Sequence, residues 1–183
     1  MNWTIPGTTL TEPRSAADQM PEIFHSMFLA GGMVLSQVAA VTGLEPYTIQ
    51  NWVKRGFLAP PVNKRYNMEQ VCRIIIINML KGSLTLEKIC SLMQYINGSL
   101  TDESDDIIDD AVLYFMFVKL AARARHIGGS QAWEDALDEA TASYAEPYPG
   151  ARERVQQVLR AMLMAYIASR FQAQVDAMVD SLK

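Results

Sequence analysis

Apolar residues recur at steps of three and four positions through most of the chain, which is the spacing of an amphipathic helix. No stretch alternates apolar and polar residues as a half-buried strand does. The longest helical pattern covers about thirty residues: Val155, Val158, Leu159, Met162, Leu163, Tyr166, Ile167, Phe171, Val175, Met178, Val179 and Leu182. The hydropathy pattern therefore predicts an all-α fold.

Capping residues and glycines set the expected helix ends in the first half of the chain. A helix is expected to begin at Pro46 and to stop at Gly56, since proline is favoured at a helix start and glycine at a helix end. Asn67 and Gln70 form a capping box, and Thr85 can cap the next helix. The helices expected up to residue 98 cover 22–29, 35–41, 46–55, 67–81 and 85–95.

The second half of the chain is expected to hold three more helices. The segment 101–129 begins with acidic residues and ends with basic ones, as the helix dipole favours, and is predicted to be one long helix. Two others are predicted over 130–145 and 152–182. We divide the chain into an extended N-terminal arm with a short helix (1–33), a middle domain (34–98) and a helical C-terminal domain (99–183).

Composition restricts the classes of protein that this chain can represent. It has 183 residues, 50% hydrophobic and 20% charged, as in ordinary globular proteins. We find no secretory signal and no apolar run near the roughly twenty residues of a membrane span, so a cytoplasmic protein without membrane contact is expected. Two cysteines and two histidines indicate neither a disulfide framework nor a metal site.

Charge is unevenly distributed along the chain. Residues 30–95 carry seven Lys and Arg against three Asp and Glu, a net charge of +4. The remainder carries nine against seventeen, a net charge of −8. A basic region within an acidic protein is typical of a chain that meets nucleic acid through one part only.

The predicted helix 46–55 has an apolar side made by Ile49, Trp52 and Val53. Its other faces carry polar groups suited to DNA, since Gln and Asn amides pair with adenine edges and cations pair with phosphates. The alternative is that these side chains only form a solvated face. The exposed residues expected there are Tyr47, Thr48, Gln50, Asn51, Lys54 and Arg55.

The order of motifs in residues 34–95 resembles the start of MerR-like transcriptional regulators. The matching elements are Thr42-Gly43, Pro46, Thr48-Ile49, Trp52, Lys54 and Gly56-Phe57-Leu58, followed by KRYNMEQV at the end of a wing and by SLTLEKICSLM. The loop between Leu58 and Lys64 is shorter than the wing of that family. More narrowly, IQNWVKRGFLAPPVNKRY with IIIINMLKGSLTLEKI is similar to an uncharacterised bacterial family, the domain of unknown function numbered 1836.

The resemblance implies a MerR-like winged helix-turn-helix followed by a C-terminal helical bundle, and a sequence-specific transcriptional regulator that binds double-stranded DNA. We expect a homodimer paired through the helix 152–182; the alternative is that this helix folds back on the 111–125 helix within one chain. The predicted DNA contacts are Tyr47, Thr48, Gln50, Asn51, Lys54, Arg55, Lys64, Arg65 and Tyr66.

Other functions have weaker support in the sequence. A protein interaction module with a degenerate helix-turn-helix and an excisionase-like DNA-bending protein remain alternatives. No catalytic, cofactor-binding or metal-binding motif is recognised, and the acidic residues 102–110 lack the spacing of a calcium loop. A small apolar effector could bind among aromatic and methionine side chains: Tyr114, Phe115, Phe117, Trp133, Tyr144, Tyr148 and Met162.

Overall fold

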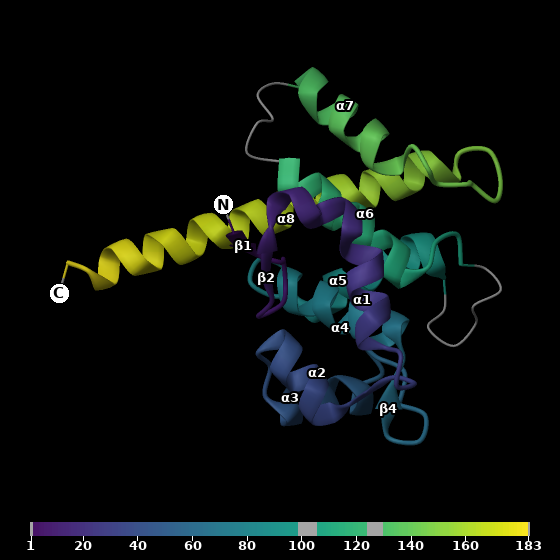
Figure 1. The fold of residues 1–183 in the computed structure, drawn as a ribbon. Coiled ribbons are helices and arrows are strands. Elements are labelled where there is room, and N and C mark those ends of the chain that lie inside the picture. Colours follow the sequence, from purple (N-terminus) through teal and green to yellow (C-terminus); the bar gives the residue numbers. More distant parts are fainter. Residues whose placement is uncertain (1, 99–105, 124–129, 183) are drawn as a thin grey trace.

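The computed structural model (Figure 1) describes residues 2–98, 106–123 and 130–182, and most of them are helical, as the sequence predicts. Two small antiparallel sheets, β1 with β2 and β3 with β4, were not predicted, because strands of two or three residues are too short to alternate. The elements are β1 (Asn2–Thr4), β2 (Thr11–Pro13), the 3-10 helix η1 (Arg14–Gln19), α1 (Met20–Met27), β3 (Met33–Val34), α2 (Leu35–Thr42), α3 (Pro46–Lys54), β4 (Arg65–Tyr66), α4 (Met68–Leu80), α5 (Leu86–Asn97), α6 (Asp110–Arg123), α7 (Ser130–Thr141) and α8 (Ala151–Asp180).

The predicted helix starts in the middle of the chain are confirmed. Pro46 is the first residue of α3. At the start of α4 the Asn67 side chain accepts from the Gln70 amide at 2.8 Å, and the Gln70 side chain accepts from the Asn67 amide at 3.0 Å. The Thr85 hydroxyl accepts from the Lys88 amide at the start of α5. Local capping therefore determines where these helices begin.

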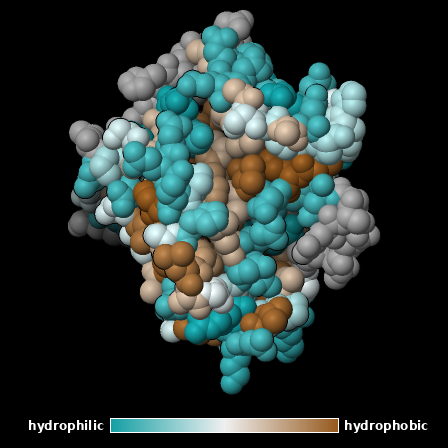
Figure 2. All heavy atoms as spheres, turned by 45° about the vertical axis from the view of Figure 1, so that its right-hand side comes forward, coloured by the Kyte–Doolittle hydropathy of each residue, from teal (hydrophilic) through white to brown (hydrophobic). Residues whose placement is uncertain are grey.

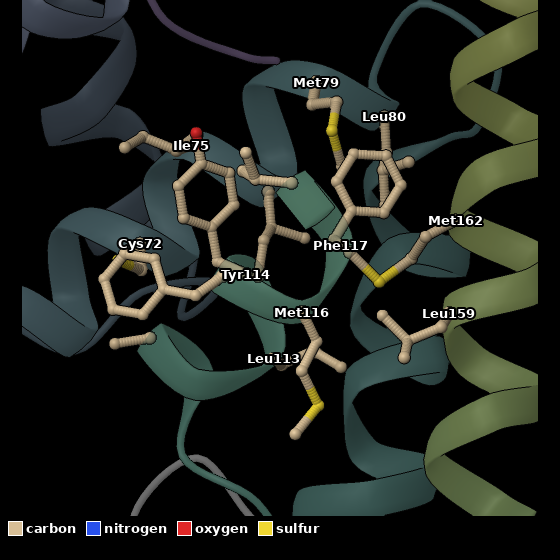
Figure 3. Close-up of a cluster of buried hydrophobic side chains, with 14 of the residues drawn as sticks. Cys72, Ile75, Met79, Leu80, Leu113, Tyr114, Met116, Phe117, Leu159 and Met162 are labelled. Atoms are coloured by element: carbon tan, nitrogen blue, oxygen red, sulfur yellow. The ribbon is translucent and has the colours of Figure 1, made fainter. Parts of the chain in front are cut away.

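Helix α4 lies at the centre of the fold and packs against α2, α5, α6 and α8. Eight of its thirteen residues are buried, and they lie on all sides of the helix. Figure 3 shows Ile75 and Met79 of α4 beside Tyr114 and Phe117 of α6, with Met162 of α8 closing the cluster. One continuous core therefore runs across the expected boundaries at residues 33 and 98.

The N-terminal segment is a packed hairpin, whereas the sequence predicted an extended arm. Its turn lies against α4 and α6, where Ile5 is fully buried. The Tyr114 hydroxyl donates to the carbonyl of Pro6 at 2.9 Å, and the Asn78 amide donates to the carbonyl of Gly7 at 2.9 Å. A side chain on Gly7 would collide with the Ile75 carbonyl, so this glycine permits the close approach. The segment was mispredicted because its contacts are with residues distant in sequence.

Helix α6 begins at Asp110, later than the predicted long helix over 101–129. The Asp109 carboxylate accepts from the amides of Ala111 and Val112 at 2.6 and 3.2 Å and so caps the helix. Asp109 and Asp110 therefore occupy the helix start. The acidic residues at 102–105 lie outside the described residues. The rest of the predicted helix, 124–129, also lies outside the described part.

A buried ion pair joins α4 to α6. Arg73 Nε lies 2.5 Å from Asp110 Oδ2, and the two side chains are only 14% and 10% exposed. The Asn97 amide at the end of α5 donates to the other Asp110 oxygen at 3.3 Å. Burial raises the pKa of Asp110, and the charge of Arg73 acts in the opposite direction. The pair therefore holds three helices together while carrying a desolvation cost.

The two halves of α8 have different surroundings. The first half packs on α5, α6 and α7, with the Tyr166 ring 5.7 Å from that of Phe117 in an edge-on arrangement. From Arg170 onward every described residue is exposed, and Figure 1 shows this half extending away from the rest of the molecule. Folding back on α6, the alternative left open by the sequence, is therefore observed for the first half alone.

We expect Arg73→Met to destabilise the fold by about 3 kcal/mol at pH 7, because it leaves the buried Asp110 carboxylate without its counterion. The loss of stability should shrink as the pH falls. The pKa of Asp110 is raised in the folded state, so the carboxyl becomes neutral there at a pH where it is still ionised in the unfolded chain. Urea unfolding at several pH values measures both effects.

The control is the double variant Arg73→Met with Asp110→Leu, which removes both charges. It should recover most of the stability lost by Arg73→Met. A double variant that is no more stable than the single one would contradict the importance of the pair.

Candidate nucleic-acid interface

Helix α3 is held against the core by one face and exposes another. Ile49 is fully buried and Trp52 is 3% exposed, so the prediction that Trp52 belongs to the core is confirmed. Tyr47, Gln50 and Lys54 are exposed. These three residues are separated by three and four positions, which places them on one side of the helix.

A hollow of about 700 Å³ lies beside this exposed face. Gln50 and Lys54 of α3 line it, together with Ser36 at the start of α2 and Lys64 from the loop before β4. Its other lining residues, mostly apolar, are Val34, Leu35, Val53, Pro61 and Tyr66. The lower part of Figure 2, at the height of α2 and α3 in Figure 1, carries apolar patches between polar side chains. The fold thus brings four predicted contact residues, Gln50, Lys54, Lys64 and Tyr66, around one concave surface.

Lys64 stands at the tip of a tight hairpin. The Val62 amide donates to the Arg65 carbonyl at 3.1 Å, and the Arg65 amide donates to the Val62 carbonyl at 2.9 Å. Asn63 and Lys64 are therefore the two turn residues. Both have positive φ, 51° and 62°. Such a turn is ordinarily occupied by Asn followed by Gly, because glycine has no side-chain penalty there. Lys64 therefore adopts a strained backbone conformation.

Two of the predicted phosphate-binding cations have partners within the chain. Arg55 forms an ion pair with Glu87 of α5 at 3.2 Å, and its guanidinium lies 4.6 Å from the centre of the Phe57 ring. Arg65 donates to the carbonyl of Gly32 at 2.8 Å. Neither residue lines the hollow. Both remain exposed, but these contacts engage their guanidinium groups within the chain.

The remaining predicted residues differ in accessibility. Thr48 and Asn51 are half-buried at the sides of α3. Tyr66 is 3% exposed, and burial raises the pKa of its hydroxyl. The contact of Tyr66 with DNA stays a prediction, since its side chain lines the hollow but offers little exposed surface.

Sequence analysis missed five residues of the hollow: Val34, Leu35, Ser36, Val53 and Pro61. Ser36 lies in the first turn of α2, where a hydroxyl group commonly contacts an anion. Its position in the predicted helix could therefore have identified it as a candidate phosphate contact. The nearness of α2 to the hairpin was not visible in the sequence, because it depends on the pairing of β3 with β4.

The sites considered as alternatives gain no support from the structure. Among the described residues, no group of three or more His, Cys, Asp and Glu side chains could hold a metal ion. Tyr114, Phe117 and Met162 are fully buried and pack in the core, whereas Tyr148 is exposed, so the proposed effector residues do not surround one common space. No described helix has the length and apolar character needed to cross a membrane.

Comparison with known proteins places the chain among relatives without an assigned role. It is 31% identical over 84 residues to the uncharacterized protein YkrK of Bacillus subtilis (strain 168). That match covers 44% of this chain and 36% of YkrK, so the chain matches little more than a third of the relative's length. No solved structure matches.

The profile of one family, described as Domain of unknown function (DUF1836), matches residues 18–117. The match runs from η1 into α6 and includes α2, α3, the hairpin and the central helix α4. It covers more than half of the chain. The protein therefore belongs to the DUF1836 family.

Proposed function

We propose that this protein is a sequence-specific DNA-binding protein, similar to MerR-like transcriptional regulators, in which α2 and α3 form a helix-turn-helix and the hairpin Val62–Arg65 acts as a short wing. The observation that carries the proposal is the convergence of Gln50, Lys54 and Lys64 on one hollow from two separate elements. An amide for base edges beside two cations for phosphates is the combination that DNA recognition requires.

The exposed side of α3 is suited to the major groove. Its apolar side is fixed by Ile49 and Trp52, so Gln50 and Lys54 project from a helix that is rigidly positioned. An α-helix fits the major groove, where a glutamine amide can bind adenine through two hydrogen bonds. Asn51, half-buried at the edge of this face, would contact a neighbouring base.

Ser36 extends the proposed contact surface. It is exposed in the first turn of α2, where backbone amides and the helix dipole favour an anion. A phosphate bound there would fix the orientation of the protein without specifying sequence. Ser36, Lys54 and Lys64 would then hold the DNA backbone on both sides of α3.

The strain at Lys64 agrees with a functional role for its side chain. A non-glycine residue in the left-handed region costs about 1 kcal/mol, and a glycine at this position of the turn would remove that cost. Strained residues of this kind are concentrated at functional sites. A cation held at the tip of the hairpin is what a wing contact with phosphate requires.

A second candidate function is a protein interaction module, which the apolar lining of the hollow favours. Val34, Leu35, Val53 and Pro61 could receive an apolar side chain of a partner, with Lys54 and Lys64 attracting acidic groups around it. Titration with mixed-sequence duplex DNA separates the two functions. Binding that weakens steeply with salt supports DNA recognition, and absence of binding at low salt supports the protein partner.

The first prediction concerns phosphate contacts. Lys54→Ala and Lys64→Ala should each weaken binding on every duplex and flatten the logarithmic salt dependence by about one unit, because each cation neutralises roughly one phosphate. Fluorescence anisotropy over a salt series measures the slope. Lys88→Ala removes an exposed cation of α5 outside the hollow and should leave the slope unchanged. If all three variants show the same salt dependence of DNA binding, the DNA-binding surface does not include Lys54 and Lys64.

The second prediction concerns base recognition. Gln50→Ala with Asn51→Ala should lower discrimination by about 1–3 kcal/mol at one or two base positions and leave affinity for random duplex nearly intact. Selection from a randomised DNA library, carried out for both proteins, provides the comparison. An unchanged selected site would remove these amides from the assignment. A two-fold symmetric site supports a regulator, and a direct repeat in bent DNA supports the excisionase-like alternative.

The third prediction separates stability from function at the hairpin tip. Lys64→Gly should raise the free energy of unfolding by about 0.5–1 kcal/mol, because glycine adopts positive φ without strain, and it should weaken DNA binding through the lost charge. Lys64→Asn is the matched variant, since asparagine tolerates this conformation without supplying a cation. Denaturant unfolding and anisotropy are measured on both. A glycine variant that is less stable than the wild type would contradict the role of strain.

A further inference from the structure

Helix α8 carries a regular apolar seam on its exposed side from Met164 onward. Its members follow one another at steps of four, three, four, three and four residues, which is the heptad spacing of helices that pair along their length. All are exposed, with Phe171 at 64% and Met178 at 67%. The seam consists of Met164, Ala168, Phe171, Val175, Met178 and, just beyond the helix end, Leu182.

The seam faces away from the molecule's own core. Successive helix residues are about 100° apart around the axis, so Val155, Leu159 and Met162 lie on the side opposite to the seam. Those three residues are at most 1% exposed. The apolar stripe expected from the sequence is therefore two stripes on opposite faces, one used inside the chain and one left uncovered.

The borders of the seam carry no charge. Within residues 164–182 the charged side chains are Arg170, Asp176 and Asp180, each about 120° or more around the helix from the seam centre. The positions directly beside the seam are Ala, Ile, Gln, Val and Ser. Charged residues beside a seam set the choice and orientation of the partner, whereas uncharged borders bring no charge repulsion when a second copy of the same helix approaches.

We propose that the seam binds the same seam of a second copy of this chain, with the two helices antiparallel. The six seam positions are symmetric about the midpoint between Phe171 and Val175. When two copies of the helix run antiparallel about this point, every seam residue therefore faces a seam residue of the other copy. The facing pairs are Met164 with Leu182, Ala168 with Met178, and Phe171 with Val175, and each pair occurs twice across the two-fold axis.

Side-chain size selects the antiparallel arrangement. In it the largest residue, Phe171, faces the smaller Val175, and the smallest, Ala168, faces the long Met178, so the layers have similar volumes. A parallel pair would place Phe171 against Phe171 and Ala168 against Ala168, crowding one layer and leaving a void in another. Antiparallel helices also bring opposite ends of their dipoles together.

The base of the seam lies beside a concave part of the surface. A hollow of about 250 Å³ lies there, lined on one side by Ala121 of α6 and on the other by Ile167 and Phe171 of α8. The seam spans nineteen residues, about 28 Å of helix. An interface of this length, with six apolar layers, should give a reversible dimer.

Light scattering of the full-length protein across a concentration series tests the interface. We expect a dimer for the wild type, a monomer for Val175→Glu, and a dimer for Ala173→Glu, which introduces the same charge on the exposed side opposite the seam. The dissociation constant of Val175→Glu should rise at least about tenfold, because one carboxylate enters each of the two layers in which Val175 faces Phe171. A monomeric wild type, or a Val175→Glu protein as dimeric as Ala173→Glu, would overturn the proposal.

Disulfide formation tests the orientation. In a Cys90→Ser background, a mixture of Met164→Cys and Leu182→Cys proteins should form a cross-linked dimer under mild oxidation, whereas neither variant alone should do so. Cross-linking of each variant alone would reveal a parallel pair and overturn the arrangement. These seam residues do not belong to the α3 surface, so DNA binding by a monomeric variant and dimerisation without DNA binding are distinguishable results.

Discussion

Helix α4 has apolar side chains on all sides, so every neighbouring element must supply surface to cover it. The run Ile74–Ile77 leaves no face for solvent, and α2, α6 and α8 each pack against it. The N-terminal hairpin completes the enclosure, with Asn78 bonding both Gly7 and Thr42 through its amide. Removing this helix from the fold would expose the core on every side of it.

This arrangement connects the proposed DNA surface to the rest of the protein. The end of α2 is bonded to Asn78, and the exposed face of α3 depends on Ile49 and Trp52 being held in place. On its other side α4 is joined to α6 by Arg73 and Asp110. The proposed DNA surface and the first half of α8 are therefore parts of one packed body, and the seam extends from that body on a continuous helix. A dimer formed through the seam would place two such bodies at a distance set by α8.

Local signals in the sequence were enough to place α3, α4 and α5, because Pro46, Asn67 and Thr85 act on their own first turns. Features that depend on distant contacts were not predictable. The pairing of β3 with β4 buries Tyr66, and the ion pair of Arg55 with Glu87 joins α3 to α5. Neither can be deduced from spacing along one helix. For the same reason the two apolar stripes of α8 were predicted as one, since hydropathy does not show which side of a helix packs against the core.

For the candidate site, composition and helix spacing identified the exposed side of α3 and the cations around it. The structure then separated Lys54 and Lys64, which line the hollow, from Arg55 and Arg65, which have partners elsewhere. The strain at Lys64 could not be anticipated, because lysine is an unfavourable residue for that turn and only the backbone angles reveal it. The apolar part of the hollow was also missed, since it is assembled from β3, α2, α3 and the loop before β4.

Hydrogen exchange of the full-length protein, with and without a short mixed-sequence duplex at low salt, tests the central claim most directly. If α3 and the hairpin bind DNA, the amides of residues 50–54 and 62–65 should exchange more slowly in the presence of duplex, together with those at the start of α2. Amides of α7, which lies outside this surface, should be unaffected. Protection confined to α7 or the distal part of α8, or no change at any amide under conditions where DNA is in excess, would contradict the account.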